Sequence, residues 1–321
     1  MPLPRYVIPL SIFGTTFGGI VLLKDYMSGG RFSGKERIPG KTVIVTGANT
    51  GIGKETAKEL ARRGGRVILA CRDLDRAEQA RAEIVLETAN RNVVVKKLDL
   101  ASMGSIRAFA KDINATEPHV DILINNAGIM RCPKMLTEDG FEMQLGVNHM
   151  GHFLLTNLLL DKIQASKPSR IVNVSSLAHV RGKINFDDLN SSKSYDPGEA
   201  YAQSKLANVL FTQELANKLE GTGVTANSLH PGIVSTELAR HMSISKSYIS
   251  SFLLTPVRWL ILKSPVQGAQ TTLCCALASE LEGVTGKYFS DCKEKEVAEQ
   301  GKDDEAAKRL WAISEKWTRL S

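Results

Sequence analysis

The chain has 321 residues, enough for one large α/β domain or two small ones, and without internal repeats we expect a single compact domain. Its net charge is +7, but the basic residues are scattered and do not alternate with aromatic residues. This pattern argues against nucleic-acid binding and favours an anionic membrane surface or a polyanionic cofactor. Five cysteines without metal-ligand spacing predict reduced thiols and no metal site.

The N-terminal segment is strongly apolar. Residues 6–23 carry no charge and are bounded by Arg5 and Lys24. As a helix they would extend about 27 Å, close to the roughly 30 Å of bilayer hydrocarbon. No small-residue cleavage site follows Lys24, so we predict an uncleaved membrane anchor over residues 1–24 rather than a signal peptide. Pro9 and several glycines leave an interfacial or targeting role open.

A glycine-rich loop follows a linker predicted over residues 25–40. Residues 42–45 predict a short strand and residues 54–63 a helix, with TGANTGIG between them. Strand, glycine loop and helix in this order are typical of a dinucleotide-binding site, because glycines let the backbone approach a pyrophosphate at the helix N-terminus. An ordinary tight turn is the alternative. The candidate cofactor-binding residues in the loop are Gly47, Asn49, Thr50, Gly51, Ile52 and Gly53.

The second and third predicted strands, residues 66–70 and 93–98, each end at a candidate cofactor residue. NAD-selective folds commonly place an acidic residue after the second strand, whereas this chain has Arg72. An arginine suits a ribose 2′-phosphate, so NADP is favoured over NAD; the alternative is a surface arginine paired with a nearby aspartate. Asp99 is a candidate acceptor for an adenine amino group, and capping the helix that begins near Ser102 is equally plausible.

Residues 120–124 form an apolar run typical of a strand buried on both faces, and NNAG follows at 125–128. Asn126 and Gly128 are candidate cofactor contacts, although these asparagines could instead tie strand ends together. A helix predicted over residues 141–164 contains Asn148, whose unfavourable interior position indicates a kink or a bound water. His149 and the other histidine in this helix lack a third ligand, so no metal site is predicted.

The remaining strands, residues 170–175 and 224–229, complete a six-stranded, doubly wound parallel sheet of Rossmann type. Ser176 lies at the end of the fifth strand, where such sheets bind ligands, although serine is also common in turns. After the sixth strand come three more candidate cofactor residues, Pro231, Gly232 and Thr236.

Tyr201 and Lys205 lie four residues apart in a predicted helix, residues 201–219, and therefore share one of its faces. The phenol pKa is ordinarily about 10, so a tyrosine that acts at neutral pH needs a nearby positive charge to favour its phenolate. Lys205 can supply that charge. By itself the YxxxK pattern is weak, because a solvated surface pair has the same spacing.

The C-terminal part is predicted from its apolar patterning. Residues 246–262 form a broken apolar segment that suits a lid over a hydrophobic substrate, with a core helix pair or a dimer contact as the alternative. A capping box at Ser264 opens a helix, residues 287–290 predict a last short strand, and residues 303–320 predict an amphipathic helix. We predict a Rossmann domain over residues 41–295 and a helical tail over residues 296–321.

Taken together, these motifs resemble the short-chain dehydrogenase/reductase superfamily over residues 40 to about 290. The resemblance rests on the glycine loop, NNAG, Asn148, Ser176, the Tyr201–Lys205 pair and Pro231-Gly232. Longer stretches such as NHMGHFLLTNLLLDK and YAQSKLANVLFTQELA are similar to the membrane-associated, NADP(H)-preferring retinol dehydrogenases. One departure is Thr50, where several NADP-binding relatives carry a basic residue.

The resemblance implies four catalytic residues and hydride transfer with NADPH. Tyr201 would donate a proton to the developing alkoxide and Ser176 a hydrogen bond. Lys205 would bind the nicotinamide ribose and keep the pKa of Tyr201 low, while Asn148 would hold a water.

The same resemblance implies all-trans-retinal reduction as the favoured reaction. Lipid aldehydes or keto-steroids are alternative substrates, and a catalytically idle NADP-binding membrane protein is the alternative of another class. The similarity to the retinol dehydrogenases favours the mitochondrial inner membrane over the endoplasmic reticulum membrane. Oligomeric state is not predicted.

Overall fold

A single twisted sheet organises the computed structural model, which describes residues 18–19, 21–238, 260 and 262–320. The strand order is β3-β2-β1-β4-β5-β6-β7-β8. All neighbours pair in parallel except β7 and β8, which form an antiparallel hairpin at one edge. The strands are β1 (Thr42–Thr46), β2 (Arg66–Cys71), β3 (Val93–Lys97), β4 (Ile122–Asn125), β5 (Ser169–Val174), β6 (Val224–His230), β7 (Tyr288–Ser290) and β8 (Lys293–Lys295).

The predicted doubly wound parallel sheet is confirmed, and its topology locates the ligand-binding edge. The chain moves outward from β1 to β2 and β3, then returns to pair β4 with the other side of β1. This reversal creates a crevice at the carboxyl ends of β1 and β4, where open α/β sheets bind ligands. The prediction missed β8, because its sequence KEK is fully exposed and has no apolar residue to signal a strand.

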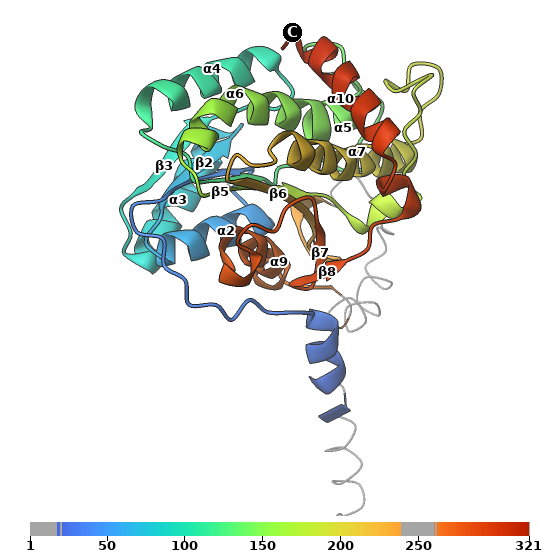
Figure 1. Ribbon diagram of the computed structural model, residues 1–321. Helices are drawn as coiled ribbons and strands as arrows, with labels where there is room; N and C mark the ends of the chain where they lie inside the picture. Colours follow the sequence, from blue (N-terminus) through green and yellow to red (C-terminus); the bar gives the residue numbers. More distant parts are fainter. Residues whose placement is uncertain (1–17, 20, 239–259, 261, 321) are drawn as a thin grey trace, which may run out of the picture.

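Helices cover both faces of the sheet (Figure 1). One face is covered by α2 (Gly51–Arg62), α3 (Leu74–Thr88) and α9 (Pro265–Leu277). The other face is covered by α4 (Met103–Thr116), α6 (Gly151–Ala165) and α7 (Pro197–Lys218), with α10 (Asp304–Thr318) packed outside them.

The apolar core forms two clusters, one on each face of the sheet. Phe153 is fully buried at the centre of the larger cluster, with its ring centroid 4.9 Å from Trp311 and 5.3 Å from Phe211. Trp311 belongs to the predicted amphipathic tail, so α10 docks on the domain through its apolar face, with Leu310 also buried.

The N-terminal segment reaches the domain as a helix and then as an extended strap. Residues 21–28 are helical, so the first part of the predicted linker is not irregular. Beyond them, Phe32 N–H donates to Gln270 Oε1 (3.1 Å), and Arg63 donates to the Gly34 and Glu36 carbonyl oxygens at 2.8 and 2.9 Å. Most of the predicted anchor lies outside the described residues. Within the described ranges, no helix is both long and apolar enough to cross a membrane.

Candidate active site

The glycine loop joins β1 to the N-terminus of α2. Gly51 has a positive φ of 57°, and a Cβ on Gly53 would lie 2.4 Å from the Gly47 carbonyl oxygen and 2.5 Å from Asn126 Nδ2. Only glycine fits so close an approach. Thr50, the N-cap of α2, makes no side-chain cap hydrogen bond, and the first turn has no acidic residue. These features leave the helix N-terminus suited to an anionic group.

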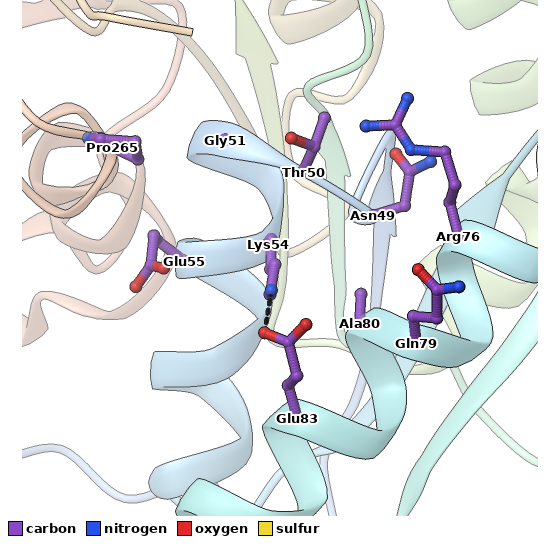
Figure 2. A pocket seen from close by; sticks show the side chains of 10 residues that line it. All are labelled: Asn49, Thr50, Gly51, Lys54, Glu55, Arg76, Gln79, Ala80, Glu83 and Pro265. Carbon is purple, nitrogen blue, oxygen red and sulfur yellow. Dashed lines mark hydrogen bonds and ion pairs between the residues drawn. The ribbon is translucent and has the colours of Figure 1, made fainter. Parts of the chain in front are cut away.

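Beside this helix N-terminus lies a pocket of about 330 Å³ (Figure 2). Its lining includes the predicted Asn49, Thr50 and Gly51, and two basic residues that the prediction missed, Lys54 and Arg76. Lys54 bonds Glu83, and Arg76 forms a 2.7 Å ion pair with Glu237. The lining residues are Asn49, Thr50, Gly51, Lys54, Glu55, Arg76, Gln79, Ala80, Glu83 and Pro265.

Arg72 lies directly after β2, where the prediction put a phosphate-binding residue, and its side chain is exposed. The alternative pairing with a neighbouring aspartate is not found among the ion pairs of the described residues. Asp73 instead caps α3 by accepting from Arg76 N–H (3.1 Å). No ion pair within the described part of the chain involves the Arg72 guanidinium, which is exposed.

Asp99 does not cap the following helix. Ser102 is the N-cap of α4 and accepts from Ser105 N–H (3.3 Å). The Asp99 carboxylate accepts from Ala101 N–H (3.0 Å), within the turn after β3. Of the two roles considered for Asp99, helix capping is therefore wrong, and the adenine contact stays a prediction.

The Thr46 hydroxyl, at the end of β1, organises the NNAG loop. It accepts from Asn126 N–H and Ala127 N–H, both at 2.9 Å, while Asn126 Nδ2 donates to the Thr46 carbonyl oxygen (2.8 Å). Asn125 Nδ2 bonds Asn173 Oδ1 (2.7 Å), joining β4 to β5. The architectural role considered for these asparagines is thus confirmed, and it fixes the loop that carries Gly128.

His152 connects Thr46 to the helix that carries Asn148. His152 Nδ1 lies 3.0 Å from the Asn148 carbonyl oxygen, which can only accept, so Nδ1 carries the proton. Nε2 then accepts the hydroxyl hydrogen of Thr46 at 2.9 Å. We refer to these three residues as the Thr46–His152–Asn148 chain. Burial lowers the pKa of His152 to about 4, so the imidazole is neutral at physiological pH.

Asn148 lies in a π-helical turn rather than in the continuous helix that was predicted. The segment divides into α5 (Met143–Leu145), the π-helix η1 (Gly146–Met150) and α6. Asn148 Oδ1 accepts from Ile129 N–H (2.9 Å), and Nδ2 donates to the Ile129 carbonyl oxygen (3.0 Å) and to Ser204 Oγ (2.9 Å). The irregularity predicted at Asn148 takes the form of this π-helical turn, in which the Asn148 side chain bonds the loop after β4.

Lys205 and Asn148 both approach Gly128. A Cβ on Gly128 would lie 3.3 Å from Asn148 Oδ1 and 3.5 Å from Lys205 Nζ. Lys205 Nζ donates to the Val174 carbonyl oxygen (3.0 Å), and burial lowers the pKa of Lys205 to about 8. A buried ammonium with one carbonyl partner retains donors for the hydroxyl groups of a bound ligand.

Tyr201 and Ser176 complete the site. The Ser176 side chain lies close enough to Tyr201 to act on its pKa, and Lys205 Nζ lies 5.9 Å from the Tyr201 ring centroid. The pKa of Tyr201 is raised, because burial disfavours the phenolate more than Ser176 favours it. The expected lowering by Lys205 is not found, since burial and Ser176 are the two causes of the shift, and the phenol is a proton donor at neutral pH.

The loop after β6 closes over the same edge of the sheet. A Cβ on Gly51 would lie 3.2 Å from Thr236 Cγ2, so Thr236 covers the N-terminus of α2. Gly232 follows Pro231 with a φ of 86° and contacts the aliphatic chain of Lys263. Of the apolar lid predicted over residues 246–262, all but residues 260 and 262 lie outside the described residues.

Residues 41–246 match the protein family described as short chain dehydrogenase. The chain belongs to the short-chain dehydrogenase family. As a short-chain dehydrogenase it is an oxidoreductase, as predicted. It is 60% identical over 311 residues to "Retinol dehydrogenase 13" of Homo sapiens, covering 97% of this chain and 94% of that protein. It is 54% identical over 298 residues to human "Retinol dehydrogenase 11", covering 91% and 90%. The predicted likeness to retinol dehydrogenases is confirmed.

Solved structures show the same fold. An uncharacterized protein from Mycobacterium paratuberculosis superposes with a TM-score of 0.72 at 37% identity, covering 91% of this chain and 98% of that one. A Beutenbergia cavernae protein described as an NAD(P)-dependent gluconate 5-dehydrogenase, with bound NADP, gives a TM-score of 0.63 at 25% identity, covering 80% and 97%.

This short-chain dehydrogenase brings its predicted residues to one edge of the sheet, but sequence reasoning missed Thr46, His152, Lys54 and Arg76. Thr46 and His152 are 106 residues apart, so no local spacing links them. A polar residue at the buried end of a strand was the one available signal for Thr46. Lys54 and Arg76 follow their motifs by one helical turn or less, and a search for basic residues around the glycine loop would have found them.

Buried histidines make the stability of the enzyme sensitive to acid, and burial lowers the pKa of His230 and His179 as well as that of His149 and His152. Burial lowers the pKa of His149 to about 3 and that of His152 to about 4, against about 6.5 in the unfolded chain. Below about pH 6.5 the unfolded state binds more protons, so we expect the free energy of unfolding to fall by about 1.4 kcal/mol per pH unit for each histidine.

Urea unfolding between about pH 7 and pH 5, above the range where most carboxylates titrate, measures this slope. His149→Leu should make the slope shallower, because it removes one titrating imidazole. The variant should still fold, because Ser314, the hydroxyl partner of His149, keeps its bond to the Leu310 carbonyl oxygen. An equal slope in both proteins would contradict the assignment.

Proposed function

We propose that this chain is an NADP(H)-dependent oxidoreductase that interconverts all-trans-retinal and all-trans-retinol, with reduction favoured. The observation that carries the proposal is the assembly of Asn148, Ser176, Tyr201 and Lys205 at the ligand-binding edge of the sheet, in a chain 60% identical to "Retinol dehydrogenase 13". The apolar lid predicted over residues 246–262 suits a long hydrophobic substrate.

The donor set around the glycine loop fits a dinucleotide. The uncapped N-terminus of α2 suits the pyrophosphate, and Arg72 suits a 2′-phosphate. When bound, the nicotinamide would supply the hydride chemistry of the reaction. The residues that would hold the dinucleotide are Gly47, Asn49, Thr50, Gly51, Ile52, Gly53, Arg72, Asp99, Asn126, Gly128, Tyr201, Lys205, Pro231, Gly232 and Thr236.

The polar residues of the chain then act on the substrate oxygen. Tyr201 donates its phenolic proton to the carbonyl oxygen as negative charge develops there, and Ser176 donates a second hydrogen bond to that oxygen. The raised pKa of Tyr201 favours its protonated form, which suits reduction. Lys205 would bind ribose hydroxyls and stabilise the phenolate left by proton donation. Asn148 would hold a water, and its two bonds to the Ile129 backbone fix the loop after β4.

Arg72→Ala tests the choice of cofactor. A hydrogen bond to a charged group contributes about 1.5–3 kcal/mol, so loss of the Arg72 guanidinium should lower kcat/KM with NADPH about 10- to 100-fold. The value with NADH should change little, because NADH has no 2′-phosphate. Steady-state kinetics with both cofactors measure the ratio.

Arg76→Ala is the matched control, since Arg76 pairs with Glu237. A smaller loss with NADPH than in Arg72→Ala would keep Arg72 as the main phosphate contact. Equal losses with NADPH and NADH in Arg72→Ala would contradict the NADP proposal.

The substrate is tested with purified enzyme in detergent. All-trans-retinal is supplied with NADPH or NADH, and the absorbance of the reduced nicotinamide is followed, with parallel reactions containing a lipid aldehyde and a keto-steroid. Fast consumption of NADPH with retinal supports the proposal. Faster turnover of the aldehyde or the steroid would reassign the substrate and leave the catalytic residues unchanged.

We also propose membrane attachment through residues 1–24, with the mitochondrial inner membrane as the favoured site. Similarity to "Retinol dehydrogenase 13" and the uncharged stretch of residues 6–23 support this proposal. Carbonate extraction of cell fractions should leave the full chain in the mitochondrial pellet and release a variant lacking residues 1–24. Recovery in endoplasmic reticulum membranes would favour the alternative location.

A further inference from the structure

Two cysteines meet at the edge of the sheet, away from the catalytic residues. Cys274 lies on α9 and is buried, and Cys292 lies in the turn between β7 and β8, where it is partly exposed. The Cys274 thiol donates to the Cys292 carbonyl oxygen (3.8 Å), so the Cys274 sulfur lies directly against Cys292. Cys292 N–H donates to Thr271 Oγ1 (3.3 Å), which holds the turn against α9.

Cys292 is an unusual residue for its position in the turn, because the backbone there has a positive φ. Ser290 pairs with Lys293, so Asp291 and Cys292 form a two-residue hairpin loop with φ values of 53° and 59°. Such loops favour asparagine and glycine, because both central residues have positive φ. A cysteine there breaks the local preference, and residues that do so without a stability benefit commonly have another role.

We propose that Cys274 and Cys292 form a reversible disulfide, so that the junction between α9 and the β7–β8 turn is a site of oxidative modification. Hydrogen peroxide is the class of oxidant. The Cys274 thiolate attacks one peroxide oxygen, forming an S–O bond as the O–O bond breaks and hydroxide leaves. Cys292 then attacks the Cys274 sulfur, the S–S bond forms, and the S–O bond breaks with release of water. In total two thiols and one peroxide give one disulfide and two waters.

The surroundings favour Cys274 as the reacting sulfur. The neighbouring Cys292 side chain lowers the pKa of Cys274, and Arg170 contributes in the same direction. The neighbouring Cys275 differs, because complete burial raises the pKa of its thiol well above the usual range. A lowered thiol pKa next to a second cysteine is typical of redox-sensitive pairs.

The turn between β7 and β8 contacts two other segments of the chain, on which a disulfide in the turn would act. Asp291 pairs with Lys263, whose chain contacts Gly232 in the candidate cofactor loop. A Cβ on Gly30 would lie 2.0 Å from the Asp291 carbonyl oxygen, so the N-terminal strap also packs on this turn. Oxidation would link this turn covalently to α9, and both segments contact the turn.

The full-length enzyme is treated with hydrogen peroxide, alkylated, digested without reductant and analysed by mass spectrometry. We expect the free thiols to fall from five to three, with a cross-linked peptide pair joining Cys274 to Cys292 that dithiothreitol removes. Cys275→Ala is the control. It keeps the cross-link and resolves which of the two adjacent cysteines forms it.

Cys292→Gly should abolish the cross-link while keeping the fold, because glycine suits the positive φ of this position. Pairing of Cys274 with Cys275, a cross-link between two chains, or oxidation to sulfinic acid alone would each overturn the proposal. None of these readouts depends on the substrate, so the result is independent of the proposed function.

Discussion

Tyr201→Phe should lower kcat for retinal reduction by about 10²- to 10⁴-fold, the usual contribution of a positioned general acid. The substitution removes the hydroxyl that donates the proton and leaves the ring, which is almost completely buried. Lys205 keeps its bond to the Val174 carbonyl oxygen in the variant. NADPH affinity, measured from the fluorescence of the bound nucleotide, should therefore be nearly unchanged.

Tyr195→Phe is the matched control for losing a partly buried phenol. The Tyr195 hydroxyl donates to the Cys132 carbonyl oxygen (2.7 Å) and accepts from Gln144 Nε2 (2.9 Å), so its role is structural. This variant should lose stability but keep its activity per folded molecule. Normal turnover in Tyr201→Phe, or an equal loss in both variants, would remove Tyr201 from the acid role.

The sequence predicted the parts of the site whose signals are local. TGANTGIG lies between a strand and a helix, and Tyr201 and Lys205 share one helix face by spacing alone. Residues 120–124 read as a buried strand because they are continuously apolar, and the four residues of β4 are indeed buried. These features can be predicted because each depends only on residues a few positions away in the sequence.

Features that depend on distant partners were not predicted. Arg76 pairs with Glu237, which lies 161 residues further along the chain. His152, on a helix, bonds Thr46 at the end of a strand of the sheet. The pKa of Tyr201 was expected to fall because Lys205 is near in sequence, whereas burial, a property of the whole fold, raises it. The π-turn at Asn148 was foreseen only as a kink, since its form depends on bonds to Ile129 and Ser204.

The Thr46–His152–Asn148 chain makes His152→Ala the substitution with the largest expected effect outside the four catalytic residues. It removes two buried hydrogen bonds, one from the Thr46 hydroxyl and one to the Asn148 carbonyl oxygen, while the Thr46 hydroxyl keeps the bonds that it accepts from Asn126 N–H and Ala127 N–H. Each lost bond costs about 0.5–1.5 kcal/mol and the missing imidazole leaves a cavity, so the free energy of unfolding should fall by roughly 2–5 kcal/mol. Because Asn148 then loses one of its supports, kcat should also fall, by about 10- to 100-fold.

His149→Ala separates the two effects. His149 is equally buried, but it bonds Ser314 on α10 rather than the glycine-loop strand. We expect a similar loss of stability in urea unfolding with kcat per folded molecule unchanged. His152→Gln should restore part of the activity, because its amide can donate to the Asn148 carbonyl oxygen and accept from Thr46. If His152→Ala and His149→Ala instead lose kcat equally, the chain has no specific part in positioning Asn148, and both histidines act only through the packing of the core.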